Sequence, residues 1–189
     1  MGLKEVFDES KPHLGGNAAV HNPHTFCEGS WKYIIDKYNI KSVLDVGSGY
    51  GFTPKWFSEQ GLKAYAIEGL QKNVDNAVYP TECVDLTEKS YTIDVDMVNC
   101  VEVVEHIEEK YLDNLLTTLT CGKYLFMTHG LPGQRGHHHV NNQPTQYWID
   151  HLAKRGFFES EEDSGHIKRI ALKEGVTHVI QTGMLFIKK

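Results

Sequence analysis

The sequence predicts an α/β fold in which a parallel sheet carries helices on both faces. Three observations support this. Strand-like and helix-like segments alternate at least five times, a glycine-rich turn follows the first strand, and acidic residues follow the next three. Ligands of such sheets bind at the carboxyl ends of the strands, where the strand order reverses. The acidic residues therefore predict a binding site at that edge.

Short apolar runs bounded by turn residues predict the strands. They are residues 42–46, 64–67, 82–84, 95–101, 124–127, 157–158 and 183–188. Apolar residues at helical spacing predict the helices. These are residues 25–39, 54–61, 71–77, 111–119 and 147–156. Thr53 as N-cap and Pro54 as first helical residue predict the second helix start, and glycines mark several helix ends. Residues 164–177 have no pattern that favours one type.

The amino-terminal segment differs in composition from the rest of the chain. Glycine, proline and asparagine interrupt residues 1–24 too often for a long regular element. We expect an irregular arm there, which is either disordered or folds over a site. Residues 25–189 are expected to form one domain, because 189 residues leave little room for two.

Composition narrows the class of protein. Nineteen Lys and Arg against 25 Asp and Glu give a net charge of −6, which argues against a broad nucleic-acid surface. The four cysteines form no CxxC pair, so neither a zinc knuckle nor a disulfide framework is indicated. No apolar run is long enough to span a bilayer, and no signal core precedes the domain. We therefore expect a soluble, cytoplasmic protein without membrane or nucleic-acid partners.

The glycine-rich turn has the spacing GxGxG over residues 47–51. A dinucleotide fingerprint requires GxGxxG, and Phe52 occupies the place of its third glycine, which disfavours a nicotinamide-dependent dehydrogenase. Asp45, just before the turn, suits a cationic methionine group better than a pyrophosphate. Glu68 ends the second strand, where a carboxylate can accept both hydroxyls of a ribose.

Residues 43–51 together with Glu68 resemble the class I S-adenosylmethionine-dependent methyltransferases, and the resemblance covers residues 40–130. It implies a Rossmann-like three-layer sandwich whose seven-stranded sheet is parallel except for one strand near the carboxyl end. By this resemblance the glycines line the amino-acid end of the cofactor, Glu68 binds the ribose, and Asp85 with Leu86 lies near the adenine. The implied cofactor-binding residues are Asp45, Gly47, Ser48, Gly49, Gly51, Glu68, Asp85, Leu86, Cys100 and Val101.

A Glu-x-x-Glu-His run follows the fourth strand. On a helical turn, Glu102, Glu105 and His106 would point the same way and could bind Mg²⁺ or Mn²⁺. A similar run supplies metal ligands in small-RNA 2′-O-methyltransferases and ubiquinone-pathway O-methyltransferases. The alternative is structural, because acids in a first helical turn complement the helix dipole and His106 could simply cap or pack.

A long polar loop follows the fifth strand and contains His137, His138 and His139. A loop of this length more often lines a site than merely joins two elements. In metal-dependent relatives a further histidine ligand comes from this region. Alternatively, one of these histidines, or His106, is a general base for a substrate hydroxyl, or the loop is only solvated.

These features predict an S-adenosylmethionine-dependent methyltransferase that O-methylates a small hydroxylated metabolite, such as a sugar derivative. A hydroxyl acceptor requires a base or a metal to become nucleophilic. An amine or thiol acceptor needs neither, and the histidines and acids would then have only a structural role. A metal-dependent RNA 2′-O-methyltransferase is a first alternative, against which the acidic balance counts. A non-catalytic relative that only binds the cofactor is the second.

Overall fold

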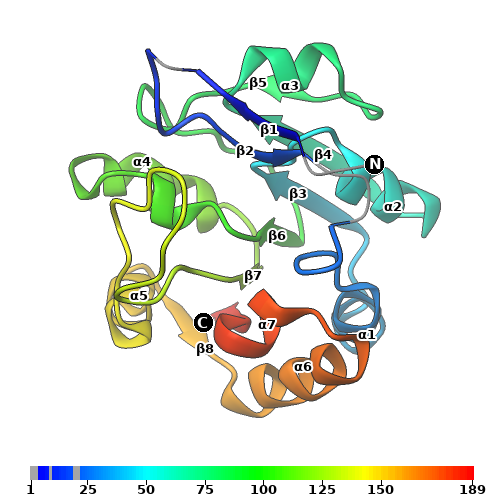
Figure 1. Cartoon of the computed structure of the whole chain (residues 1–189). Helices are drawn as coiled ribbons and strands as arrows, with labels where there is room; N and C mark the ends of the chain where they lie inside the picture. The colour runs from blue at the N-terminus through cyan, green and yellow to red at the C-terminus, as the bar shows by residue number, and fades with distance from the viewer. Residues whose placement is uncertain (1–3, 9, 19–21) are drawn as a thin grey trace.

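The computed structural model describes residues 4–8, 10–18 and 22–189 (Figure 1). A seven-stranded sheet with the order β5-β4-β3-β6-β7-β9-β8 forms its centre. The strands are β3 (Ser42–Val46), β4 (Lys63–Glu68), β5 (Glu82–Cys83), β6 (Met97–Cys100), β7 (Tyr124–Met127), β8 (Phe157–Glu159) and β9 (Met184–Lys188). Only β9 runs antiparallel to its neighbours β7 and β8 in this sheet. The mostly parallel seven-stranded sheet is therefore confirmed.

Helices cover both faces of the sheet (Figure 1). The α-helices are α1 (Glu28–Tyr38), α2 (Phe52–Glu59), α3 (Gln71–Asp75), α4 (Leu112–Leu119), α5 (Thr145–Ala153), α6 (Glu161–Glu174) and α7 (Thr177–Thr182). Two short 3₁₀ turns, η1 (Val104–His106) and η2 (Glu109–Tyr111), lie between β6 and α4. None of the helices in the described ranges is both long and apolar enough to cross a bilayer.

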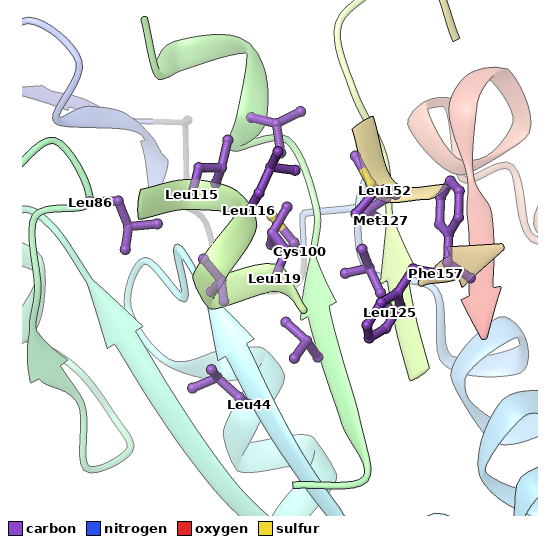
Figure 2. Packing of buried hydrophobic residues seen from close by; sticks show 14 of the residues in the cluster. Leu44, Leu86, Cys100, Leu115, Leu116, Leu119, Leu125, Met127, Leu152 and Phe157 are labelled. Atoms are coloured by element: carbon purple, nitrogen blue, oxygen red, sulfur yellow. The ribbon is translucent and has the colours of Figure 1, made fainter. Parts of the chain in front are cut away.

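The central strands are buried on both sides, so their side chains alternate between two hydrophobic clusters. Leu44 of β3 packs with α4 and α5, whereas its neighbour Val43 packs with α1, α2, α6 and α7. Figure 2 shows residues of the first cluster, among them Leu44 of β3, Leu119 of α4 and Leu125 of β7. Burying each such leucine contributes about 1.5–3 kcal/mol to folding.

The order of the strands reverses beside β3. Its neighbours are β4 on one side and β6 on the other. The strands that follow β3 in the chain, β4 and β5, lie on one side of it, and the later strands lie on the other. Asp45 of β3 pairs in register with Asn99 of β6. Two polar side chains therefore stand side by side near the carboxyl ends of the strands.

Several predicted boundaries differ from the structure. Helix α2 begins at Phe52 with Gly51 as its N-cap, so the predicted cap at Thr53 is wrong by two residues. Gly51 has φ of +75°, a left-handed conformation that glycine adopts without strain. The glycine turn can therefore end at Gly51, and the helix begins at the next residue. Strand β6 is shorter than the predicted 95–101, because the Asp96 side chain instead accepts hydrogen bonds from the backbone of Lys41 and Ser42.

The amino-terminal arm is more regular than predicted. Strands β1 (Lys4–Phe7) and β2 (Gly15–Ala18) form an antiparallel hairpin. Gly15 and Gly16 lie within β2 and Pro12 in the connection, where the Leu14 amide donates to the carbonyl of Lys11 (2.8 Å), and none of them prevents pairing. Part of the predicted arm, residues 1–3, 9 and 19–21, lies outside the described residues. The domain boundary after residue 24 stays a prediction.

Candidate active site

The glycine turn joins β3 to α2 at the point where the strand order reverses. Gly47, Gly49 and Gly51 have φ of +71°, +54° and +75°. The amides of Gly47 and Ser48 both donate to the carbonyl of Ile67, at 2.9 and 3.0 Å, which fixes the turn against β4. A Cβ atom on Gly49 would meet no atom within 4 Å, whereas one on Gly47 would lie 2.4 Å from Val103 Cγ2. The turn therefore leaves open space beside Gly49.

Glu68 stands at the end of β4 and faces this turn. Its Oε2 accepts the Gly49 amide at 2.9 Å, and its Oε1 accepts the Leu70 amide at 2.9 Å. Only 8% of the residue is exposed. Burial raises the pKa of Glu68, although these backbone hydrogen bonds oppose the shift. The carboxylate is thus fixed in place, ready to accept hydroxyl donors of a ligand.

Asp45 lies just before the turn and is almost fully buried, with 3% exposed. The Asn99 amide donates to Asp45 Oδ1 at 2.5 Å, and the oxygen of that amide accepts the indole N–H of Trp31 at 2.9 Å. Burial raises the pKa of Asp45 to about 7, against the hydrogen bond from Asn99. A bound cation would favour the ionised form of this carboxyl.

A cavity of ≈ 340 Å³ opens beside these groups. Asp45, Gly49 and Glu68 line it on the strand side, and it extends to Val101 and Glu102 after β6. A smaller cavity of ≈ 90 Å³ adjoins it, lined by apolar residues that include Val84, Leu86 and Ile107. Gly47 and Glu68 line both cavities, which therefore form one continuous candidate site.

The structure brings most predicted site residues to these cavities. They are Asp45, Gly47, Ser48, Gly49, Glu68, Leu86, Val101, Glu102, His106, His137 and His139. Gly51, Asp85, Cys100, Glu105 and His138 line neither cavity. Cys100 points into the hydrophobic cluster (Figure 2), because successive residues of β6 face opposite sides and Asn99 takes the other one. The Cys100 side chain therefore does not line either cavity, and a role for Cys100 in cofactor binding stays a prediction.

Asp85 follows β5 by two residues and is held by the amino-terminal arm. Lys11 Nζ lies 3.0 Å from Asp85 Oδ2, and His13 Nε2 lies 3.1 Å from both carboxylate oxygens. Burial alone would raise the pKa of Asp85, but hydrogen bonds from Thr87, Lys11 and His13 outweigh it and lower this pKa to about 2. Asp85 thus fastens the arm across the smaller cavity, which His13 and Leu14 also line.

Glu102 has a left-handed backbone, with φ of +56°. This conformation costs a non-glycine residue about 1–3 kcal/mol, and such strain clusters at functional sites. The Thr128 hydroxyl accepts the Glu102 amide and donates to Glu102 Oε1, both at 2.9 Å. His178 Nδ1 lies 2.8 Å from Oε2 of the same carboxylate. Burial favours the neutral acid, but the hydrogen bonds and attraction from His178 and Thr128 outweigh it and lower the pKa of Glu102.

Glu105, His106 and His139 form a second cluster at the edge of the larger cavity, which His106 and His139 line. Their potential ligand atoms lie within 4.8 Å of one another. Both Glu105 oxygens and the Nδ1 atoms of His106 and His139 are buried without a hydrogen-bond partner among the described residues. Burial and the nearby Glu102 raise the pKa of Glu105, and burial lowers the pKa of His106 to about 4.

This cluster overlaps the predicted metal site only in part. Glu105 and His106 lie together with His139 of the loop. The two residues of the run are brought together by a 3₁₀ turn and not by an α-helix. The left-handed backbone of Glu102 directs its two carboxylate oxygens to Thr128 and His178, although the carboxylate still contacts the Glu105 side chain. Glu102 as a metal ligand stays a prediction.

Sequence reasoning did not identify His178 or Asn99. Asn99 is a polar residue inside an apolar strand, so the expected alternation offered a signal for it. His178 is the second residue of α7, where neither spacing nor motif marks a functional residue.

Comparison with known proteins supports this architecture. No family model matches the chain. A ubiquinone biosynthesis O-methyltransferase of Rickettsia bellii is 36% identical over 102 residues, which cover 44% of this chain and 42% of that protein. The chain thus matches less than half of the length of this curated relative. Magnesium protoporphyrin IX methyltransferase of Synechocystis PCC 6803, solved with bound S-adenosylmethionine, has a TM-score of 0.62 at 13% identity over 86% of this chain and 78% of that one.

The fold and the glycine turn define the class: the chain has the fold of the class I S-adenosylmethionine-dependent methyltransferases, as the sequence predicted. Within that class, its similarity in sequence is to O-methyltransferases of ubiquinone biosynthesis. The [4+2]-cyclase SpnF also matches, with a TM-score of 0.54 at 13% identity over 83% of this chain and 79% of its own. The fold therefore does not define the reaction by itself.

Proposed function

We propose that the protein is an S-adenosylmethionine-dependent O-methyltransferase that acts on a small hydroxylated molecule. The observation that carries this proposal is the Gly49 amide held at 2.9 Å from the buried Glu68 carboxylate, beside an open cavity at the strand reversal. The curated relatives that match the chain are named as O-methyltransferases.

The chain's own residues supply three subsites for the cofactor. Glu68 is placed to accept ribose hydroxyls, and Asp45 with Asn99 supplies acceptors for the cationic amino-acid end. The smaller apolar cavity, with Leu86 on its wall, suits a purine. The bound cofactor supplies an activated methyl group, so the protein needs to align the acceptor, exclude water and remove a proton.

The acceptor would occupy the part of the larger cavity near Glu102 and the histidine loop. His106, His137 and His139 line this part. The net charge of −6 disfavours a polyanionic acceptor, so we favour a small molecule such as a sugar derivative or a phenol over RNA. The cytoplasmic location stays a prediction.

Calorimetry and a methyl-transfer assay test this function together. We expect S-adenosylhomocysteine to bind the full chain, and Glu68→Gln to weaken binding at least about tenfold by removing a charged acceptor. Radiolabelled S-adenosylmethionine with 3,4-dihydroxybenzoate, methyl glucoside and benzylamine then separates hydroxyl from amine acceptors. Turnover of benzylamine alone contradicts O-methylation. Binding without any turnover favours a non-catalytic relative.

We also propose that Glu105, His106 and His139 hold a divalent cation, Mg²⁺ or Mn²⁺. Their unpartnered buried atoms fit a cation, because one carboxylate and two neutral imidazoles then gain the partner they lack. Such an ion would orient an acceptor hydroxyl and ease its deprotonation. Electron paramagnetic resonance of Mn²⁺ should show binding to the wild type and a loss in His139→Gln. Equal Mn²⁺ spectra for both proteins would exclude His139 as a ligand.

RNA is the alternative acceptor if the metal site is confirmed. Its binding should weaken steeply with salt, since each phosphate contact releases counterions. Titration of a fluorescent single-stranded RNA at 50 and 200 mM salt distinguishes it from a small acceptor.

A further inference from the structure

The pair formed by His178 and Glu102 lies outside the residues that the proposed function uses for the cofactor or the cation. Both side chains line the larger cavity, with 29% of His178 and 17% of Glu102 exposed. Their only link to each other is the 2.8 Å contact between Nδ1 and Oε2. The pair therefore joins a buried carboxylate to an imidazole that reaches the cavity.

The geometry fixes the roles of the two nitrogens of His178. A carboxylate accepts hydrogen bonds and donates none, so Nδ1 carries the proton in this contact. In the neutral ring Nε2 then holds a lone pair, and among the described residues it has no hydrogen-bond partner. An imidazole in this tautomer can take a proton from a hydroxyl placed in the cavity.

Three features hold Glu102 in the orientation that this tautomer needs. Its backbone is left-handed, and Thr128 bonds both its amide and its Oε1, leaving Oε2 for His178. The His178 backbone is held as well, because its amide donates to the carbonyl of His24 at 3.2 Å, and the ring of His24 lies edge-on to the imidazole with centroids 6.2 Å apart. The strain at Glu102 thus has a function: it aims the carboxylate at the histidine.

We propose that His178 is the general base of the methyl transfer and that Glu102 is the residue that positions it; this inference rests on the proposed function. The acceptor oxygen would form a bond to the methyl carbon while the carbon–sulfur bond breaks and its electron pair stays on sulfur, giving S-adenosylhomocysteine. The hydroxyl proton would go to Nε2 of His178, and the resulting imidazolium, stabilised by Glu102, would later release it to water.

The tautomer provides a test that needs no acceptor. Nitrogen-15 NMR of the histidine-labelled full chain, with the His178 signal assigned by its absence in His178→Gln, should show the Nδ1–H form. In Glu102→Gln the preference should shift toward Nε2–H, as in free imidazole side chains. A wild-type His178 with its proton on Nε2 would overturn the inference, because that nitrogen could not accept another.

Kinetics with 3,4-dihydroxybenzoate provide the second test. His178→Gln should lower kcat about 10²–10⁴-fold, the usual contribution of a general base, with KM and S-adenosylhomocysteine affinity unchanged. Imidazole in the buffer should partly restore His178→Ala, and Glu102→Asp should retain more activity than Glu102→Gln. The matched control is His166→Gln on α6, which lines neither cavity. A His178→Gln variant with kcat within about threefold of wild type would overturn this inference and leave the proposed function standing. Wild-type protein that binds no S-adenosylhomocysteine would instead contradict the proposed function.

Discussion

At the scale of single residues, Gly47 and Gly49 share a left-handed backbone but differ in their surroundings. Alanine at either position costs about 1–2 kcal/mol of stability for that backbone conformation. Gly47→Ala should cost a further 1–3 kcal/mol or so, because its Cβ meets Val103 at 2.4 Å. Gly49→Ala should instead weaken S-adenosylhomocysteine binding, since its Cβ enters the open space of the cavity.

Urea unfolding and calorimetry separate these effects. Gly61→Ala is the matched control, because Gly61 has φ of +85° and open space around it but lines neither cavity. It should lose stability like Gly49→Ala and keep its affinity. Equal affinity losses in Gly49→Ala and Gly61→Ala would mean that Gly49 does not face the ligand.

Asp45 gives the site a dependence on pH. Its pKa of about 7 in the folded protein lies above the ~3.9 of an unfolded chain, so the folded state binds more protons between these values. The contribution of Asp45 to stability therefore falls as pH rises from about 4 to 7. Affinity for the cationic S-adenosylmethionine should rise about fivefold to tenfold from pH 6 to 8, as Asp45 ionises.

Calorimetry of wild type and Asp45→Asn at both pH values checks this prediction. The variant should bind weakly at pH 6 and 8 alike. A wild-type affinity that stays constant or falls with pH would show that the ionised carboxylate does not bind the cofactor. An affinity of the variant that still rises between pH 6 and 8 would instead point to Glu68, whose pKa is also raised by burial.

Residues at strand ends could be predicted from the sequence, whereas residues set by loops could not. Asp45 and Glu68 follow from their place at the ends of apolar runs, because parallel strands fix where those ends meet. The side that Cys100 faces could not be predicted, since one residue of register reverses the side that a strand residue faces. The partners of Glu102 depend on its left-handed backbone, which no spacing in the sequence indicates.

At the scale of elements, one carboxylate makes most of the ionic contacts that hold the amino-terminal arm. Asp85 binds Lys11 and His13, and Lys11 also pairs with Glu88. Asp85→Ala should therefore release the arm and speed chymotryptic cleavage after Phe7 severalfold, because proteolysis follows the population of the open state. The melting temperature should change little, since the hairpin does not belong to either large hydrophobic cluster.

Limited proteolysis with mass spectrometry measures this opening. Asp113→Ala is the control, because it removes another exposed ion pair, with Arg155, far from the arm in sequence. S-adenosylhomocysteine should slow the cleavage after Phe7 in the wild type if the arm closes over bound ligand. Unchanged cleavage in Asp85→Ala would mean that other contacts hold the arm.

The elements differ in how far the sequence predicts them. The strands β3, β4 and β7 follow from apolar runs between turn residues, which burial on both faces requires. Helix α6 was left undecided because its buried residues are few and polar side chains separate them, although Gly175 ends it in a left-handed conformation. The hairpin β1–β2 was missed because pairing across a connection rich in turn residues depends on contacts with Asp85 and the loop histidine His137.

At the scale of the whole molecule, one sheet separates two hydrophobic clusters, and we expect them to unfold together. Leu119 lies in the cluster of α4 and α5, and Ile167 in that of α1 and α6. Leu119→Ala should cost about 2–5 kcal/mol and Ile167→Val about 0.5–1.5 kcal/mol. Because the residues share no cluster, the costs should add within about 0.5 kcal/mol in the double variant.

Urea unfolding followed by tryptophan fluorescence and far-ultraviolet circular dichroism tests both expectations. Trp31 and Trp148 report on opposite faces, since each belongs to a different cluster. Coincident transitions in all three variants mean that β3 and β6 transmit the loss of packing across the sheet, so the site at their ends forms only with the whole fold. If Leu119→Ala separates the two transitions, each face is stable alone, and the glycine turn could then persist on the α2 side after the other face has unfolded.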